Sequence, residues 1–323
     1  PYYEYAQGTL LHEPGWYKGD LHNHTLHSDG AVTVSQMLEH AKLYEFDYHA
    51  ISDHNNVDHL FDDQWQDEAL LLISAYEWTK SGHTNMFGVR TTNLPEDQWD
   101  FDEVWETWRQ TKLQGGIISI NHYAAPDYYL YWEQALPAKP ALKDMIDCVE
   151  VWNGWWAYSA TFNPQSIEWW ETLLNDGYKI GAIGGSDSHE PMFPICFPTT
   201  HVYAESLSNL AILHGIRSGH TYVSSAYPYE GGGEAYYNTD TPAIEFEASA
   251  DWDNNYEAMI GDTVALGEIR FRVQIEGAYG LIQVVKNGEV VEEFINQEYL
   301  DTSTRNSVEY TFTDSPSSYS WYR

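Results

Sequence analysis

The segment GDLHNHTLHSDG, residues 19–30, places three histidines and two aspartates immediately before a segment with helical spacing. His22 and His24 are two residues apart, so on a β-strand both side chains point to the same face. Two imidazoles on one face can hold a single cation. Asp29 follows in a predicted loop beside Gly30. Since a lone HxH pair often arises by chance, the metal-site interpretation depends on what the rest of the chain brings to this strand end.

Residues 16–223 alternate between strand-like and helix-like segments. Helices are expected over 33–46, 100–113, 164–176 and 206–218. Thr33 is a candidate N-cap for the first of them. Strands are expected over 17–24, 46–54, 70–78, 83–90, 115–122, 147–154, 179–187 and 199–205. This alternation predicts an α/β architecture with a parallel sheet or barrel.

Histidines and carboxylates recur where the predicted strands end. Besides those in the first segment they are Asp53, His54, Glu77, His83, His122, Asp187 and His189. In β/α barrels the C-terminal strand ends surround one mouth, which carries the chemistry. We therefore expect these side chains to meet. The other histidines are interpreted as surface or packing residues, namely His12, His40, His49, His59, His201, His214 and His220.

The character of the sequence changes near residue 224. Alternating strands with turns between them follow, and the Asn-Gly pair at 287–288 is a strong hairpin signal. These features predict a small antiparallel β domain of sandwich type. We expect residues 1–223 to form an α/β domain and residues 224–323 to form the all-β domain.

The composition excludes some classes of partner. The chain has 49 acidic and 15 basic residues and a formal net charge of −34, so its surface repels nucleic acid and anionic lipid. No apolar run is long enough to span a bilayer. Cys148 and Cys196 form no CxxC pair and are interpreted as small buried residues, or alternatively as one disulfide. The start at Pro1, with no methionine and no signal peptide, indicates either a removed leader or a trimmed chain, and a removed leader would predict a secreted or periplasmic protein.

The residue types at the strand ends favour hydrolysis. Mixed imidazole and carboxylate ligands suit Zn, Mn or Fe, and a carboxylate that bridges two divalent ions brings them close together. Such a pair activates water against a phosphoester, and also against a carboxylic ester, carbamate or amide. Cysteine is absent from the expected ligands, which argues against a closed structural zinc site. No GxSxG elbow is present, which argues against a serine hydrolase.

Four ordered motifs in residues 16–223 resemble those of the PHP (polymerase and histidinol phosphatase) metal-dependent phosphoesterases. They are DLHNHTLHSDG, ISDHN, INHY and GGSDSH. The chain looks closest to a carbaryl-hydrolase-like branch of metallohydrolases, which GHTYVSS, MIGDT and VVKNGEVV also fit. The resemblance implies a distorted seven-stranded β/α barrel that holds two or three divalent ions (Zn, Mn or Fe).

The resemblance also implies three metal positions, with Glu77 bridging the first two. The ligands, position by position, would be His22, His24, Glu77 and Asp187; Glu77, His83 and His122; and Asp29, His54 and His189. Asp29 stands where some members have His, and Tyr123 where they usually have Pro. Asp53 is expected to accept a hydrogen bond from a ligand imidazole.

The predicted activity is that of a metal-dependent hydrolase, most specifically a phosphoesterase with a metal-bridging hydroxide and a small-molecule substrate. Asp187, His189 and Glu77 are the candidate catalytic residues. His27 and Asn121 adjoin ligands and are candidates for substrate contact or proton donation. Candidate substrate contacts are Lys18, Lys80, Arg217, Trp155, Trp156 and Tyr158. One alternative is a carbamate or carboxylic-ester hydrolase, and another is a non-catalytic glycan- or metal-binding module. The sequence assigns no oligomeric state.

The acidic surface leads to a testable prediction about salt. Self-repulsion among the excess carboxylates should destabilise the fold at low ionic strength, so about 2 M KCl should raise the melting temperature by about 5 °C or more over about 0.1 M. The measurement is thermal unfolding at pH 7, with a control near the sequence pI of about 4.4, where the salt effect should shrink. A melting temperature at pH 7 that is indifferent to salt would contradict the prediction.

Overall fold

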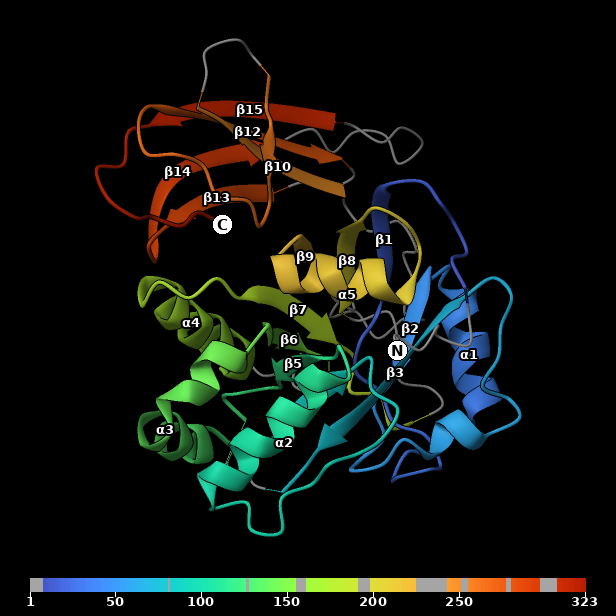
Figure 1. Ribbon diagram of the computed structural model, residues 1–323. Helices are drawn as coiled ribbons and strands as arrows, with labels where there is room; N and C mark the ends of the chain where they lie inside the picture. Colours follow the sequence, from blue (N-terminus) through green and yellow to red (C-terminus); the bar gives the residue numbers. More distant parts are fainter. Residues whose placement is uncertain are drawn as a thin grey trace.

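The computed structural model describes residues 8–80, 82–125, 128–154, 161–190, 198–224, 243–250, 255–276, 280–296 and 307–323. Residues 8–224 form a mixed α/β unit, and antiparallel sheets follow it (Figure 1). In this part of the chain, no helix is both long and apolar enough to cross a membrane.

One sheet of nine strands organises the first unit, in the order β7-β6-β5-β4-β3-β2-β1-β8-β9. The strands are β1 (Gly15–Asp20), β2 (Tyr48–Ile51), β3 (Leu71–Trp78), β4 (Thr84–Phe87), β5 (Ile117–Ile120), β6 (Cys148–Asn153), β7 (Gly181–Gly185), β8 (Thr199–Ala204) and β9 (Thr221–Ser224). β1–β2–β3 and β5–β6–β7 pair in parallel, whereas β4, β8 and β9 pair antiparallel with their neighbours.

The two ends of this sheet meet through side chains, which makes it barrel-like and nearly closed. The Thr221 hydroxyl donates to the carbonyl of Ala182, and the Thr200 hydroxyl donates to the carbonyl of Gly184, both at 2.7 Å. A Cβ at Gly184 would lie 2.8 Å from side-chain atoms of Pro198 and Val223, so glycine permits this close approach. The expected α/β architecture is therefore present, and its barrel-like sheet has nine strands, whereas the resemblance implied seven and the sequence pattern indicated eight. The strand that the sequence pattern did not indicate is β9.

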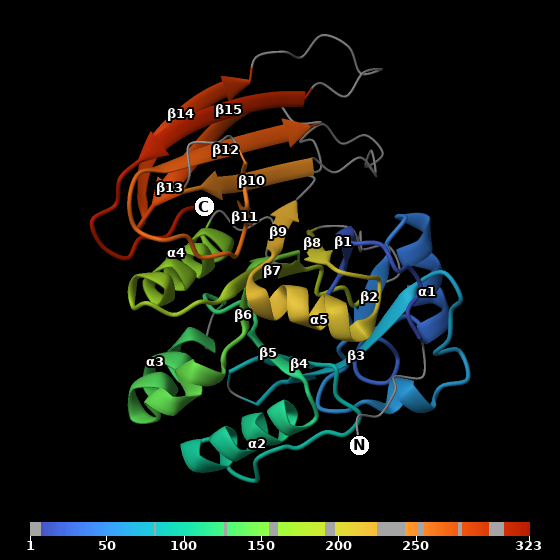
Figure 2. The ribbon, with the colours of Figure 1, turned by 45° about the horizontal axis from the view of Figure 1, so that its top comes forward.

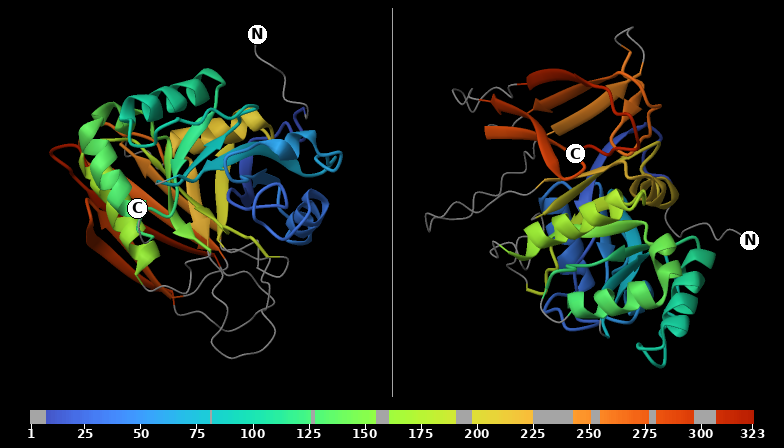
Figure 3. Two further views of the ribbon diagram at one scale, coloured as in Figure 1. Left: turned by 90° about the horizontal axis from the view of Figure 1, so that it is seen from below. Right: turned by 90° about the vertical axis from the view of Figure 1, so that its left-hand side faces the viewer.

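Five α-helices pack around the sheet, and Figures 2 and 3 show them from other sides. They are α1 (Val34–Leu43), α2 (Phe101–Leu113), α3 (Tyr128–Ala138), α4 (Phe162–Asn175) and α5 (Asn209–Ser218), with 3₁₀ turns η1 (Asp58–Phe61) and η2 (Pro140–Met145). Thr33 caps α1 in a capping box with Gln36, as the sequence indicated. One apolar cluster, which includes Trp78, Trp108 and Trp132, fills the space between the sheet and α2–α4.

The C-terminal residues form separate antiparallel sheets. One has the order β11 (Ala258–Met259), β10 (Ala243–Ser249), β12 (Ile269–Glu276), β15 (Ser307–Asp314), and the other pairs β13 (Gly280–Lys286) with β14 (Glu289–Asn296). Asn287 and Gly288, with φ of 52° and 87°, make the predicted hairpin turn. Val273, Ile275 and Val284 form a buried cluster that both sheets share.

This all-β region contacts α4 of the first unit. The Trp321 indole donates to the Asn175 side chain at 2.8 Å, and Arg323 pairs with Glu171 at 2.6 Å. Figure 3 shows the C-terminal strands on one end of the α/β unit. The contacts therefore tie the end of the chain to a helix that also supports the strand ends described below.

Burial of His201 gives a prediction for stability against pH. Its imidazole is buried in β8, lies 2.9 Å from the Ser224 hydroxyl and stacks on Tyr222, and burial lowers its pKa to about 3. As the pH falls below about 6.5, this histidine becomes protonated in the unfolded chain but stays neutral in the native state. Stability from this group is therefore complete above about pH 6.5 and is lost as the pH falls towards 3.

His201→Gln should remove this dependence. Between pH 6 and 5 the metal-free variant should lose about 1 kcal/mol less unfolding free energy than the wild type. Urea unfolding with a chelator present measures it, and His214→Gln, at an exposed position on α5, is the matched control. Equal slopes for the wild type and His201→Gln would contradict the prediction.

Candidate metal centre

The strand polarity of the sheet brings the nine predicted ligands to one end. The parallel strands β1, β2, β3, β5 and β7 present their C-terminal ends there, and the antiparallel β4 presents its start, next to His83. Bridges between Asn23 and Ser188, and between His54 and Glu77, tie the emerging loops together. The nine residues are His22, His24, Asp29, His54, Glu77, His83, His122, Asp187 and His189.

Glu77 lies at the centre of this group and is 1 % exposed. Its Oε1 is 3.1, 3.2 and 3.4 Å from ring nitrogens of, respectively, His83, His122 and His22. Its Oε2 is 3.1 Å from His54 Nδ1 and 3.6 Å from His24 Nε2. The two oxygens of one carboxylate thus face two different sets of imidazoles.

Asp187 provides a second carboxylate within this group. Its Oδ1 lies 3.2 Å from His24 Nε2 and 3.4 Å from His22 Nε2. The backbone of Asp187 has φ of 53° and that of His122 has φ of 27°, which are uncommon values for residues other than glycine. Backbone strain of this kind gathers at functional sites.

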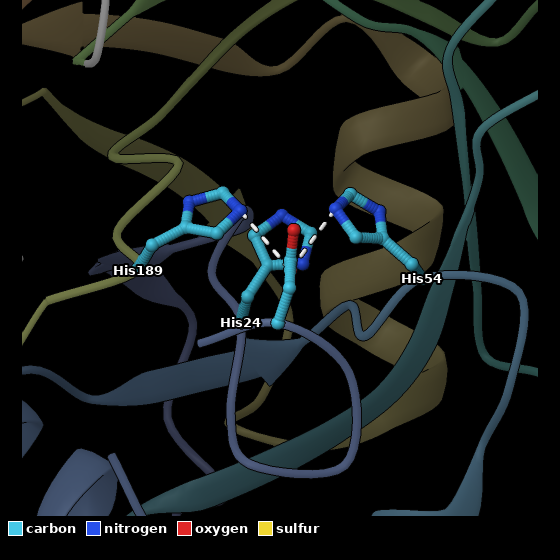
Figure 4. A group of neighbouring side chains, drawn as sticks. His24, His54 and His189 are labelled. Carbon is cyan, nitrogen blue, oxygen red and sulfur yellow. Dashed lines mark ion pairs between the residues drawn. The ribbon is translucent and has the colours of Figure 1, made fainter. Parts of the chain in front are cut away.

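Asp29 joins the more open side of the cluster. Its Oδ1 lies 3.2 Å from His54 Nε2 and 3.3 Å from His189 Nε2. The ring of His24 lies 4.2 Å, centroid to centroid, from the rings of both His54 and His189, and Figure 4 shows the three imidazoles facing a common point. Asp29 is 58 % exposed, whereas His24 is fully buried, so this side leads from the solvent to the floor of the site.

The residues fit divalent cations. Four overlapping sets of ligand atoms have all members within 4.8 Å of one another: His24, Asp29, His54 and His189; His22, His24 and Glu77; His22, His122 and Asp187; and Glu77, His83 and His122. Ligands about 2.1 Å from a tetrahedral ion are about 3.4 Å apart. Within the described residues, His22 Nε2 and both ring nitrogens of His24 are buried without a hydrogen-bond partner. A bound cation would take the lone pair of His22 Nε2 and that of one His24 nitrogen.

The charges in the cluster depend on one another. Burial disfavours the charged imidazole of His22, but Asp187, Glu150 and Glu77 outweigh it and raise the pKa well above 6.5. Burial also opposes ionisation of Glu77, yet His83 and His22 hold the pKa of this carboxyl well below its usual value. A cation that binds here therefore competes with protons on the imidazoles.

The structure shows the partners of two residues to which the sequence assigned supporting roles. Asp53, expected to orient a ligand imidazole, accepts instead from the Thr25 backbone at 2.7 Å and from the hydroxyls of Thr25 and Ser28, both at 2.8 Å. Asp53 follows β2, and these hydrogen bonds hold the loop after β1 against the end of β2. His27, the candidate proton donor, pairs with Asp62 at 2.9 Å at the half-exposed rim.

Sequence reasoning missed the supporting side chains of Glu150 and Asn153, and it named Asn121 without its contact to Glu77. Glu150 accepts a hydrogen bond from His22 Nδ1 at 2.8 Å. Asn121 donates to Glu77 Oε1 at 2.9 Å, and Asn153 donates to Asp187 Oδ2 at 3.2 Å. An acidic residue inside the predicted buried strand 147–154 was the available signal for Glu150, because a buried charge needs specific partners.

Among the candidate substrate contacts, Arg217 lies apart from this cluster and three others lie outside the described residues. Arg217 pairs with Asp147 and donates to the carbonyl of Gly116, at the opposite end of the strands. Lys80 is exposed. Trp155, Trp156 and Tyr158 lie outside the described residues, as does Cys196. Cys148 is buried with a free thiol.

Part of the chain that contains most of these residues matches a known protein family. Residues 20–152 match the PHP domain family. No curated protein matches the chain. The matched segment contains seven of the nine residues and ends before Asp187 and His189.

The chain also resembles several solved structures. A two-domain protein from Bacteroides vulgatus, described as containing a predicted PHP-like metal-dependent phosphoesterase, is 18 % identical with a TM-score of 0.52, covering 95 % of this chain and 89 % of that one. A putative metal-dependent phosphoesterase from Bifidobacterium adolescentis is 17 % identical with a TM-score of 0.38, over 53 % of this chain and 87 % of its own. A lesion-specific endonuclease from Pyrococcus furiosus is 15 % identical with a TM-score of 0.43, over 65 % and 58 %. The first likeness supports a shared fold. None of these names concerns a carbaryl hydrolase, so that branch stays a prediction.

The role of Glu77 can be tested by counting metals. We expect the wild type, loaded with Zn or Mn and dialysed, to hold at least two divalent ions per chain. Glu77→Gln should lose at least one, because glutamine keeps the shape but removes the charge that two sets of imidazoles share. Elemental analysis makes the measurement, and Glu106→Gln on the exposed face of α2 is the matched control. Full metal content in folded Glu77→Gln would refute the bridging assignment.

Proposed function

We propose that this protein is a metal-dependent hydrolase, with phosphoesters as its favoured substrates. The observation that carries the proposal is the position of Glu77, whose two oxygens face separate sets of imidazoles. A carboxylate in this position suits a di- or trinuclear site. The ligand sets proposed are the three expected from the sequence, and the donor types suit Zn, Mn or Fe.

Divalent ions bound there would supply the Lewis acidity that activates water and offsets the charge on a phosphoryl oxygen. The residues of the site differ in how deeply they are buried, and we assign their roles accordingly. Glu77, His22 and His24 form the buried floor, while Asp29, His54 and His189 lie nearer the solvent. A substrate would therefore approach from the Asp29 side.

The candidate catalytic residues are those expected from the sequence. Asp187 and Glu77 would hold the ions, and His189 would hold an ion beside the entering substrate. His27 is proposed as the proton donor to the leaving group, because its pairing with Asp62 leaves the ring at the half-exposed rim. Proton donation by a positioned imidazole is an ordinary part of such reactions.

One observation favours the alternative of a carbamate or carboxylic-ester hydrolase. In the part of the chain that the structure describes, Glu77, Asp29 and Asp187 form ion pairs with histidines and with no Lys or Arg. Phosphate recognition usually employs Arg or Lys beside the reacting group. A substrate with less negative charge than a phosphomonoester would need no such partner.

The division of the chain is part of the same proposal. Residues 1–223 would be the catalytic unit, because all nine candidate ligands precede residue 224. Residues 224–323 would be a β-sandwich domain, supported by the apolar cluster that the two C-terminal sheets share. The substrate would be a small molecule, since the net charge of −34 repels nucleic acid.

A panel of aryl substrates tests the proposed reaction. We expect an aryl phosphomonoester or phosphodiester to be hydrolysed with Mn, Zn or Fe, and the activity to vanish with a chelator and return with metal. Glu77→Gln should lower kcat on the order of a thousandfold, while Glu106→Gln should match the wild type.

The same panel includes an aryl carbamate and an aryl acetate. Hydrolysis of these alone would overturn the phosphoesterase assignment in favour of the alternative. Turnover that survives removal of metal from the wild type would overturn the metal-dependent mechanism itself.

A further inference from the structure

Glu150 is a buried carboxylate that belongs to none of the four candidate ligand sets. It lies inside β6 and is 1 % exposed. Its Oε1 faces His22 Nδ1 at 2.8 Å, and its Oε2 accepts from the backbone N–H of His122 at 2.8 Å and from the Asn153 amide at 2.9 Å. Both oxygens are therefore used as acceptors.

The first contact determines which nitrogen of His22 carries a proton. A carboxylate can only accept, so the proton of the neutral ring lies on Nδ1 and the lone pair lies on Nε2. His22 Nε2 is the atom that lies 3.4 Å from both Glu77 Oε1 and Asp187 Oδ1. Glu150 thus leaves the inner nitrogen free to bind a cation.

The second contact holds a different strand end. The backbone of His122 turns at φ of 27° directly after β5, and its N–H points to Glu150 Oε2. The Asn153 amide, bonded to the same oxygen, also lies 3.2 Å from Asp187 Oδ2. One carboxylate on β6 therefore connects candidate ligands that follow β1, β5 and, through Asn153, β7.

The residue at position 185 leaves space for the contact between Glu150 and His22 because it is a glycine. A Cβ on Gly185 would lie 2.3 Å from the Cβ of His22 and 2.8 Å from Glu150 Oε1. A side chain at this position would separate the carboxylate from the imidazole. The contact between Glu150 and His22 thus requires glycine at position 185, for a steric reason that is independent of the hydrogen bonds.

We propose that Glu150 is a positioning residue for the metal centre, and this inference rests on the proposed function. It fixes the tautomer of His22 and the backbone of His122, so metal affinity depends on it although it binds no metal. An amide cannot replace it, because glutamine has one accepting and one donating end. Glu150→Gln must either reverse the His22 tautomer or point its NH₂ at two other donors.

Zinc affinity tests the proposal. Competition titration with a chromophoric chelator should show that Glu150→Gln binds its tightest zinc about 10- to 100-fold more weakly than the wild type. Circular dichroism of the metal-free proteins establishes that both are folded, and Glu106→Gln is the matched control. Folded Glu150→Gln with wild-type affinity would overturn the inference while leaving the proposed function intact. A wild type that binds no zinc, manganese or iron would overturn both.

A measurement on the wild type keeps the proposal falsifiable if the variant does not fold. Nitrogen-15 NMR of the zinc-loaded protein reports which ring nitrogen of His22 is protonated, and the signal missing from His22→Gln gives the assignment. We expect a protonated Nδ1 and a coordinated Nε2. Coordination through Nδ1 would overturn the proposal.

Discussion

A single buried negative charge, that of Glu77, organises the open end of this barrel. An isolated carboxylate in a protein interior is very costly, so it persists only with partners of opposite charge or with a metal. Here five imidazoles and the Asn121 amide surround it, each from a segment fixed by the sheet. The surrounding histidines thus lie where they can pair with this group or share a cation with it.

The sheet supplies those partners because of its strand directions. Parallel neighbours place successive strand ends on one rim, and β4, which runs in the opposite direction, brings its start to the same rim. α4 then supports two of the loops from outside: Ser166 accepts from the backbone of Ala124, and Asn163 exchanges hydrogen bonds with the backbone of Asn153. The far end of α4 carries the C-terminal sheets through Asn175 and Trp321. The all-β region therefore contacts a helix that also buttresses the metal-site loops.

The sequence predicted the parts that depend on local pattern. Strand-end histidines and carboxylates were recognised because a strand and its following loop are contiguous, and the Asn-Gly turn was recognised for the same reason. Contacts between distant segments outside the strand-end motifs were not predicted. Glu150 meets His22 across 128 positions, and Thr221 meets Ala182 to close the sheet, neither of which leaves a periodic signal. Asp53 was given the wrong partner because adjacency to His54 in the chain does not fix the direction of its side chain.

The charge of the whole chain and the chemistry of the site oppose each other. A formal charge of −34 attracts cations to the protein and repels an anionic substrate, and the effect weakens as salt screens it. Metal loading is therefore aided by the same field that hinders a phosphomonoester dianion. With histidines as the ion-pair partners of Glu77, Asp29 and Asp187 in the described residues, the bound ions themselves would have to supply the local positive charge. For the hydrolase proposed above, this balance would hinder a diester, with one negative charge, less than a monoester with two, and a neutral carbamate or ester least of all.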